Sequence, residues 1–289
     1  MYTDMTRPSS LYNYDLGCCG EPVSDLSFPP ESLPTPNPAL LPLDPASSSF
    51  EPPDTFHQFR LTSEQAIRHA CLLQEVACEA GVQFLMDQLL FVGDINTWNH
   101  CYRVGALMIA CAIRMDLAEQ EIRLAGRVGL THDVGKSKPS VQQAIYSPQR
   151  KRPTPDDPLH AVIRNHPFYG TVMARAAGLS GNVQQCVGNH HSLQTARPAY
   201  GVFRPDALVP IAEADGKRPD LARLIGLTAC CDVYDGTTAE PAMRTRPYQN
   251  DGTEAYTSRR VTEAVASLNT NDTIKSVVLD IAWREATLL

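Results

Sequence analysis

The sequence has neither a long apolar run nor a long basic cluster, the features typical of membrane proteins and of proteins that coat nucleic acids. Its longest apolar run, Val104–Ile113, has ten residues, too few to cross a bilayer. The N-terminus has no positively charged start followed by an apolar stretch, which predicts no signal peptide. The longest basic run is the triplet 150–152, and the net charge is −7. We therefore expect a cytoplasmic protein that neither enters a membrane nor coats a nucleic-acid polymer.

Cysteine spacing excludes two further classes of protein. The nine cysteines include no Cys-x-x-Cys pair, so the sequence predicts no zinc ribbon. Cys18-Cys19 and Cys230-Cys231 are vicinal pairs, a spacing that rarely forms structural disulfides. The other five cysteines fall in apolar helical stretches, where a thiol acts as a small hydrophobic group. This usage is typical of a reducing compartment.

Strand patterns are also missing, apart from a weak indication at residues 201–203. Residues 1–58 contain eleven of the 23 prolines, and proline cannot continue helix or sheet ladders. They are predicted to form a disordered tail, either inert or a docking arm for a protein partner. Residues 59–289 are predicted to form one all-α domain.

Helical periodicity predicts a series of helices from Leu61 onward. Thr62 and Gln65 have the spacing of a capping box at the first helix. Residues 97–115 are apolar almost all round, which predicts a buried helix. The expected helices cover about 63–90, 97–115, 118–130, 158–177, 181–191, 219–239, 253–268 and 271–287, and 137–157 should form a loop with a short helix. The last helices have apolar surface for the core or for a second subunit, and the oligomeric state stays open.

The most informative feature is a set of imidazole and carboxylate side chains at long spacings. The adjacent pair His132-Asp133 lies in Leu-Thr-His-Asp-Val-Gly-Lys, residues 130–136. The full set spans 133 residues and consists of His100, His132, Asp133, His166, His190, His191 and Asp232. Such ligands suit iron, manganese or zinc, and the absence of thiolates disfavours a structural zinc. The set predicts a metal site, whereas His57, His69 and His160 are expected to be structural.

The motifs around these residues resemble those of the HD superfamily of metal-dependent phosphohydrolases. Residues 132–136 match its His-Asp-x-Gly-Lys string, and His100 stands in a leading His-x-x-Arg-Val. Four later segments are similar to the HD-GYP branch of cyclic dinucleotide phosphodiesterases: His-Pro-Phe-Tyr-Gly at 166–170, His-His at 190–191, Cys-Asp-Val-Tyr-Asp-Gly at 231–236 and Arg-Pro-Tyr at 246–248. The resemblance covers about residues 60–270 and implies an HD-domain helical bundle.

The resemblance implies a centre of two divalent ions, with iron or manganese expected and zinc, magnesium or nickel as the other candidates. Asp133 is the natural bridging ligand, because a carboxylate has two oxygens. One metal would be completed by His100, His132 and Asp232, and the other would be served by His166, His190 and His191.

The remaining site residues are assigned around this centre. Lys136, catalytic together with Asp133, is expected to hold a phosphate oxygen as a point charge. An ordinary helix-end cation is the alternative for Lys136. Gly135 is expected to let the backbone turn. Asp235 and Arg246 are expected to support the ligands or contact the substrate.

Two departures from the family pattern concern substrate and metal number. The Gly-Tyr-Pro signature is missing, and Tyr200-Gly201 is at best a scrambled remnant of it. The family's loop contacts substrate, so the substrate of this chain is open. Asn96 stands one helical turn before His100, where a trinuclear subset carries glutamate. Because asparagine is a poor metal ligand, we expect two metals rather than three.

The leading hypothesis is a dinuclear phosphodiesterase that hydrolyses a cyclic dinucleotide signalling molecule of the c-di-GMP type. One alternative is a nucleotidase or phosphomonoesterase of the wider superfamily, which the lost Gly-Tyr-Pro favours. The other is a non-catalytic domain that binds a nucleotide or a protein partner.

Overall fold

The computed structural model describes residues 58–147, 158–195, 199–203, 205–238 and 258–283, all within the unit Phe50–Leu289. The predicted tail up to residue 57, residues 148–157 of the predicted loop and Arg246 lie outside the described residues. The regular secondary structure of the described part consists of helices and two strands of two residues each. The all-α prediction is therefore confirmed.

The described helices follow the predicted order. They are α1 (Ser63–Ala77), α2 (Ala80–Phe91), α3 (Ile95–Arg114), α4 (Glu119–Thr131), α5 (Pro139–Ile145), α6 (Pro158–Ile163), α7 (His166–Ala176), α8 (Gly181–Asn189), α9 (Leu221–Thr238), α10 (Ser258–Ala266) and α11 (Asp272–Ile281). Two short 3₁₀ helices are η1 (Val134–Ser137) and η2 (Pro205–Ala207). Strand β1 (Gln58–Phe59) pairs antiparallel with β2 (Ala282–Trp283) and so ties the two ends of the described part together.

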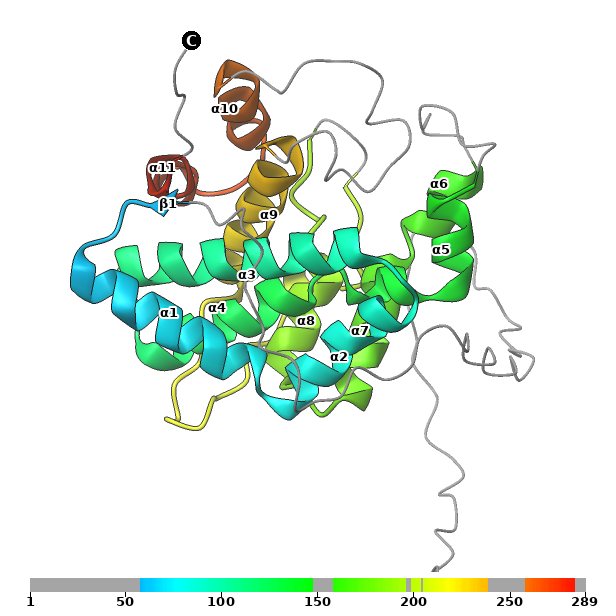
Figure 1. The fold of residues 1–289 in the computed structure, drawn as a ribbon, viewed down its shortest axis with the longest axis horizontal. Helices are drawn as coiled ribbons and strands as arrows, with labels where there is room; N and C mark the ends of the chain where they lie inside the picture. The colour runs from blue at the N-terminus through cyan, green and yellow to red at the C-terminus, as the bar shows by residue number, and fades with distance from the viewer. Residues whose placement is uncertain (1–57, 148–157, 196–198, 204, 239–257, 284–289) are drawn as a thin grey trace, which may run out of the picture. The chain divides into compact units, whose positions relative to one another are not determined.

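Helix α3 forms the centre of the core. Every residue from Cys101 to Ile113 is buried, as the all-round apolar pattern predicts. Figure 1 shows α3 at the middle of the bundle, with α1 and α4 beside it and α9 running across it. A ligand carried by α3 is therefore held on the most deeply packed element of the domain.

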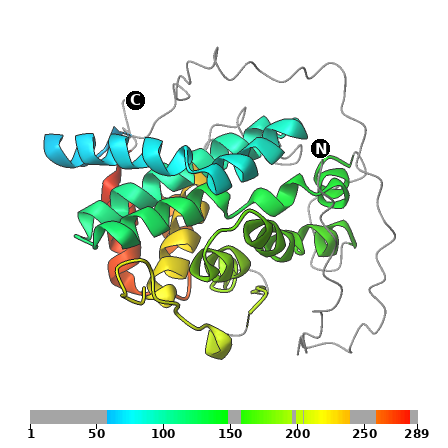
Figure 2. The same ribbon diagram turned by 90° about the horizontal axis from the view of Figure 1, so that it is seen from below.

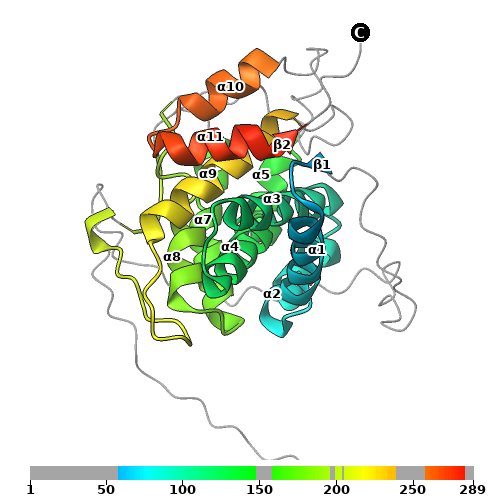
Figure 3. The ribbon, with the colours of Figure 1, turned by 90° about the vertical axis from the view of Figure 1, so that its left-hand side faces the viewer.

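The other helices cover α3 and α4 from several sides. Figure 2 shows α1 and α2, in blue to cyan, on one side of α3 and α4, with α8 and α9, in olive to yellow, on another. Figure 3 shows α10 and α11 lying over α9. Among the described residues, none of the helices has the combination of length and apolar character required to cross a membrane.

Two predicted helices are each broken into two. The first, 63–90, starts with the predicted capping box at Thr62 and Gln65 but stops at Cys78, and α2 restarts after the extended residue Glu79. Glu79 accepts two hydrogen bonds from Arg127 of α4, at 2.6 and 2.9 Å, which ties this junction to the bundle. No proline or glycine marks the break, so the single-helix prediction was wrong for a reason of tertiary structure.

The second broken helix is 158–177, which ends at Ile163 as α6 and restarts at His166 as α7. Pro167 occupies the first turn of α7, where its missing amide does no harm, and it disfavours helical geometry in the residue before it. The break places His166 at the exact start of a helix rather than in its middle.

Two pairs of glycines bring neighbouring backbones into direct contact. A Cβ on Gly129 of α4 would lie 2.7 Å from the Cα of Gly105 in α3. A Cβ on Gly135 of η1 would lie 1.9 Å from the carbonyl oxygen of His166 and 2.5 Å from the amide nitrogen of Gly170 in α7. Gly135 lies in the short 3₁₀ turn between α4 and α5, and its φ is not positive. The absent side chain permits this close approach.

We predict that Gly129→Ala destabilises the domain by about 1–3 kcal/mol, because the added methyl group would overpack the α3–α4 crossing. The matched control is Gly236→Ala in α9, where a Cβ would meet nothing within 4 Å. That change should stabilise the helix by about 0.5–1 kcal/mol. Urea unfolding of both variants measures the difference, and equal effects would contradict the crossing described here.

Candidate metal centre

The predicted ligands come from five separate regions of the fold and meet at one place. Most of them stand at helix ends, where the chain can change direction next to a ligand. Their positions are His100 within α3, His132 and Asp133 after the last turn of α4, His166 at the start of α7, His190 and His191 after α8, and Asp232 within α9. All seven predicted ligands are therefore brought together.

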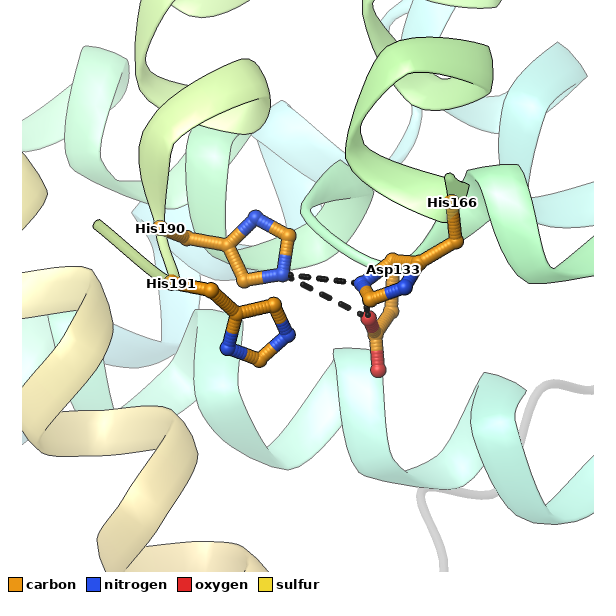
Figure 4. Close-up of side chains that lie close together, drawn as sticks. All are labelled: Asp133, His166, His190 and His191. Atoms are coloured by element: carbon orange, nitrogen blue, oxygen red, sulfur yellow. Dashed lines mark hydrogen bonds and ion pairs between the residues drawn. The ribbon is translucent and has the colours of Figure 1, made fainter. Parts of the chain in front are cut away.

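These side chains form two groups, each compact enough to hold one metal ion. Asp133, His166, His190 and His191 form one group, and His100, His132 and Asp232 form the other. Within each group, one ligand atom per residue lies within 4.8 Å of every other. Figure 4 shows the first group, with the imidazoles of His190 and His166 directed at the Asp133 carboxylate. This division matches the one that the family resemblance implies.

Asp133 stands between the two groups and faces each with a different oxygen. Its Oδ1 lies 3.0 Å from His166 Nε2 and 3.6 Å from His190 Nε2. Its Oδ2 lies 3.6 Å from both His100 Nε2 and His132 Nε2. A carboxylate with one oxygen directed at each group has the geometry required of a ligand that bridges two ions.

The backbone fixes the tautomers of three histidines. His132, His166 and His190 each place Nδ1 2.7–2.8 Å from the carbonyl oxygen of the residue three positions earlier. A carbonyl can only accept, so each Nδ1 carries a proton and donates it. In a neutral imidazole the other nitrogen, Nε2, then holds a lone pair. Three lone pairs are thus directed inward without a proton.

Burial keeps the imidazoles of His132 and His166 neutral. It lowers the pKa of His132 and of His166 to about 4, and neighbouring Asp133 offsets only part of that effect. Asp133 Oδ1 is buried and receives no hydrogen bond, although His166 Nε2 lies 3.0 Å away. The tautomer of His166 accounts for both observations, because a lone pair cannot donate. A pocket with this excess of acceptors around Asp133 Oδ1 fits a bound cation and is costly without one.

His100 is oriented by a buried ion pair. Its Nδ1 lies 2.8 Å from Asp235 Oδ2, and Arg103 donates to both oxygens of Asp235 at 2.7 and 2.8 Å. The opposite nitrogen, Nε2, lies 3.0 Å from Asp232 Oδ1. Burial lowers the pKa of His100, but the hydrogen bonds to Asp232 and Asp235 outweigh burial and raise it to about 9. A cation bound here would displace that proton.

Lys136 lies inside the site rather than at its rim. Its Nζ contacts Asp133 Oδ2, and both side chains are buried. Burial raises the pKa of Asp133, but Lys136 and the surrounding imidazoles hold it well below its usual range. Asp133 is therefore a carboxylate anion, and the cationic end of Lys136 is close enough to reach a group bound between the two ion sites.

His191, like His100, is oriented by neighbouring side chains. Its Nδ1 lies 2.5 Å from the side-chain nitrogen of Gln194 and 3.8 Å from Asp232 Oδ2. Burial holds its pKa well below the usual range.

Sequence reasoning missed Arg103, although it is the arginine of the His-x-x-Arg-Val motif. A buried arginine in an apolar helix requires a carboxylate partner, and that requirement was the available signal. The supporting position expected for Asp235 matches its place beside His100. Asn96 lies in the first turn of α3, one turn before His100. His69 lies elsewhere, 2.9 Å from the carbonyl oxygen of Ala106, as expected for a structural histidine.

Comparisons with known proteins agree with this geometry. Residues 97–228 match the family model for the HD domain. Over 179 residues the chain is 28% identical to a cyclic di-GMP phosphodiesterase from Pseudomonas aeruginosa. The matched region covers 60% of this chain and 37% of that relative. The chain therefore spans much less than half the length of that curated relative. No solved structure gives a significant match.

We predict that His132→Ala and His190→Ala each remove at least one of about two bound ions per chain. Each change deletes a lone pair from a different ligand group. Elemental analysis of the purified variants measures the stoichiometry. His69→Gln is the control, since it alters a buried histidine outside the centre and should retain the metal. Full metal content in both alanine variants would rule out this ligand set.

We predict that Asp235→Asn weakens binding of Mn²⁺ about 10- to 100-fold, because an amide cannot orient His100 as the carboxylate does. The exposed Asp280→Asn serves as control. Titration with Mn²⁺, below the melting temperature of each variant, gives the affinities. Loss of thermal stability with unchanged Mn²⁺ affinity would show that Asp235 only neutralises Arg103.

Proposed function

We propose that this chain, whose residues 97–228 match the model for the HD domain, is a metal-dependent phosphohydrolase close to the HD-GYP branch and hydrolyses phosphodiester bonds at a two-metal centre. We further propose a cyclic dinucleotide of the c-di-GMP type as substrate. The name of the Pseudomonas aeruginosa relative supports this choice, because its match includes much of this chain.

The observation that carries the proposal is the position of Asp133. One of its oxygens faces His166 and His190, and the other faces His100 and His132. A single-metal site would use only one such group of ligands. Two acceptor-rich groups that share a carboxylate fit a pair of divalent ions and the hydrolysis of a phosphate ester.

When bound, two divalent ions polarise a phosphoryl oxygen and lower the pKa of a water molecule. The protein's own groups perform the remaining tasks. Asp133 directs one oxygen at each ligand group and so connects the two. Lys136 places a positive charge beside that carboxylate, where it can hold a phosphoryl oxygen and stabilise the charge that develops on it.

The ligand chemistry also bears on the choice of ion. Five imidazoles and two carboxylates offer nitrogen and oxygen donors without thiolates. This set suits iron or manganese best, with zinc, magnesium and nickel as further candidates. We propose two ions per chain, because the ligands form two groups and asparagine, the residue at position 96, is a poor metal ligand.

The residues that directly follow the altered Gly-Tyr-Pro segment are held next to the centre. Buried Asn189, the last residue of α8, accepts hydrogen bonds from the amides of Val202 and Phe203 at 3.1 and 2.9 Å and donates to the carbonyl of Phe203 at 3.0 Å. Val202 and Phe203 are therefore anchored to the same helix end that carries His190 and His191.

We predict that the Mn²⁺-loaded protein converts cyclic di-GMP to a linear product, and that Lys136→Met lowers kcat/KM about 100-fold because one charge opposite the phosphoryl oxygen is lost. Lys138→Met, two residues further on at a partly buried position, is the matched control. Chromatography of the products gives the rates, and elemental analysis confirms that both variants keep their metal. Loss of metal from Lys136→Met would instead assign Lys136 to support of Asp133.

A substrate screen separates the alternatives. Cyclic di-GMP, 5′-mononucleotides and bis(p-nitrophenyl) phosphate are compared with the same metal-loaded protein. Cleavage of monoesters alone would make the protein a nucleotidase or phosphomonoesterase. Absence of both bound metal and turnover would leave a non-catalytic binding domain.

A further inference from the structure

A second positively charged side chain lies close to the metal centre and belongs to neither group of metal ligands. Arg164, between α6 and α7, places its guanidinium carbon 4.9 Å from the centre of the Tyr200 ring. Such a distance is within the range of a cation–π interaction, which holds a guanidinium over the face of an aromatic ring. Arg164 is only partly buried, so one side of it remains accessible.

Tyr200 connects this arginine to the ligands. Its ring centre lies 4.7 Å from that of His191 at an interplanar angle of 35°, and 6.2 Å from that of His166. Arg164, Tyr200 and His191 thus form a stack that leads from an accessible cation to the metal centre. A molecule bound at the ions would reach Arg164 across the width of one aromatic ring.

The tyrosine is held in this place by its backbone. Its amide lies 3.4 Å from the carbonyl oxygen of His191, and the following residues are bound by Asn189. The side chain of Asn189 is fully buried. The stack is therefore built into the fold on the side of the centre formed by α7 and α8.

Charge balance distinguishes Arg164 from the arginines that stabilise the fold. Arg103, Arg123 and Arg127 each donate to a carboxylate at hydrogen-bond distance. Within the part of the chain that the structure describes, no carboxylate lies within ion-pair distance of Arg164. The guanidinium of Arg164 therefore keeps its positive charge beside the proposed phosphodiesterase site, over the Tyr200 ring. Its planar donors have the geometry that binds a phosphate through two hydrogen bonds.

We propose that Arg164, supported by Tyr200, binds the second phosphate of a cyclic dinucleotide, the one that is not cleaved while the first lies at the ions. This inference rests on the proposed function. A cyclic dinucleotide carries two phosphodiesters joined through its sugars, so one can occupy the centre while the other extends outward. The stack would then select substrates with two phosphates over those with one.

The test compares two substrates, cyclic di-GMP and bis(p-nitrophenyl) phosphate, which carries a single phosphate. We expect Arg164→Ala to lower the ratio of kcat/KM for cyclic di-GMP to that for bis(p-nitrophenyl) phosphate about 10- to 100-fold, since one charge-assisted contact is lost. Arg164→Lys should restore part of the ratio as a point charge, and Tyr200→Leu should lower it less than Arg164→Ala. Arg175→Ala, an exposed arginine on α7, should keep the wild-type ratio.

Each other outcome decides against the inference or separates it from the proposed function. An unchanged ratio, or an equal loss on both substrates together with lost metal, would overturn it. If the wild-type protein hydrolyses neither compound, the proposed function fails, and calorimetric binding of cyclic di-GMP replaces the kinetics. In that case, a 10-fold or larger loss of affinity in Arg164→Ala would support the phosphate subsite without the proposed catalysis. A loss of that size is about what one charge-assisted contact contributes. Equal affinities, or no binding, would reject it.

Discussion

The buried carboxylate of Asp133 is the constraint on which the site depends. An anion in the interior is tolerated only when positive charge or donors surround it. Lys136 supplies one cation on Oδ2, but Oδ1 faces imidazole nitrogens that carry lone pairs. The fold therefore concentrates acceptors where an ordinary core would pair them. This imbalance, more than any single ligand, indicates that the centre is built for divalent ions.

Backbone contact, rather than side-chain packing, sets the separation of the ligands. The crossing at Gly105 and Gly129 brings α3 against α4, and so His100 against His132. The contact of Gly135 with α7 brings Asp133 next to His166. Because glycine has no side chain, these approaches cannot be relaxed by a change of rotamer. The fixed spacing of the two ligand groups thus originates in four glycines that are not metal ligands themselves.

Local patterns in the sequence predicted the helices, the capping box and the ligand set, because each depends on residues that are close in sequence or on a recognisable motif. The break at Cys78 was not predictable in this way, since it is held by the pairing of Glu79 with Arg127. The partnership of Arg103 with Asp235, and the stack of Arg164 on Tyr200, also join residues that are distant in sequence. Contacts of this kind become visible only after the helices are assembled.

The main-chain carbonyls that hold His132, His166 and His190 have an evolutionary consequence. Each histidine is aimed by the residue three positions earlier, through an atom that every amino acid possesses. Mutation of those neighbours can change their side chains without erasing the hydrogen bond. The direction of these three imidazoles therefore does not depend on the side chains at those three positions. The loops around the centre can therefore change in sequence while these three imidazoles keep their direction.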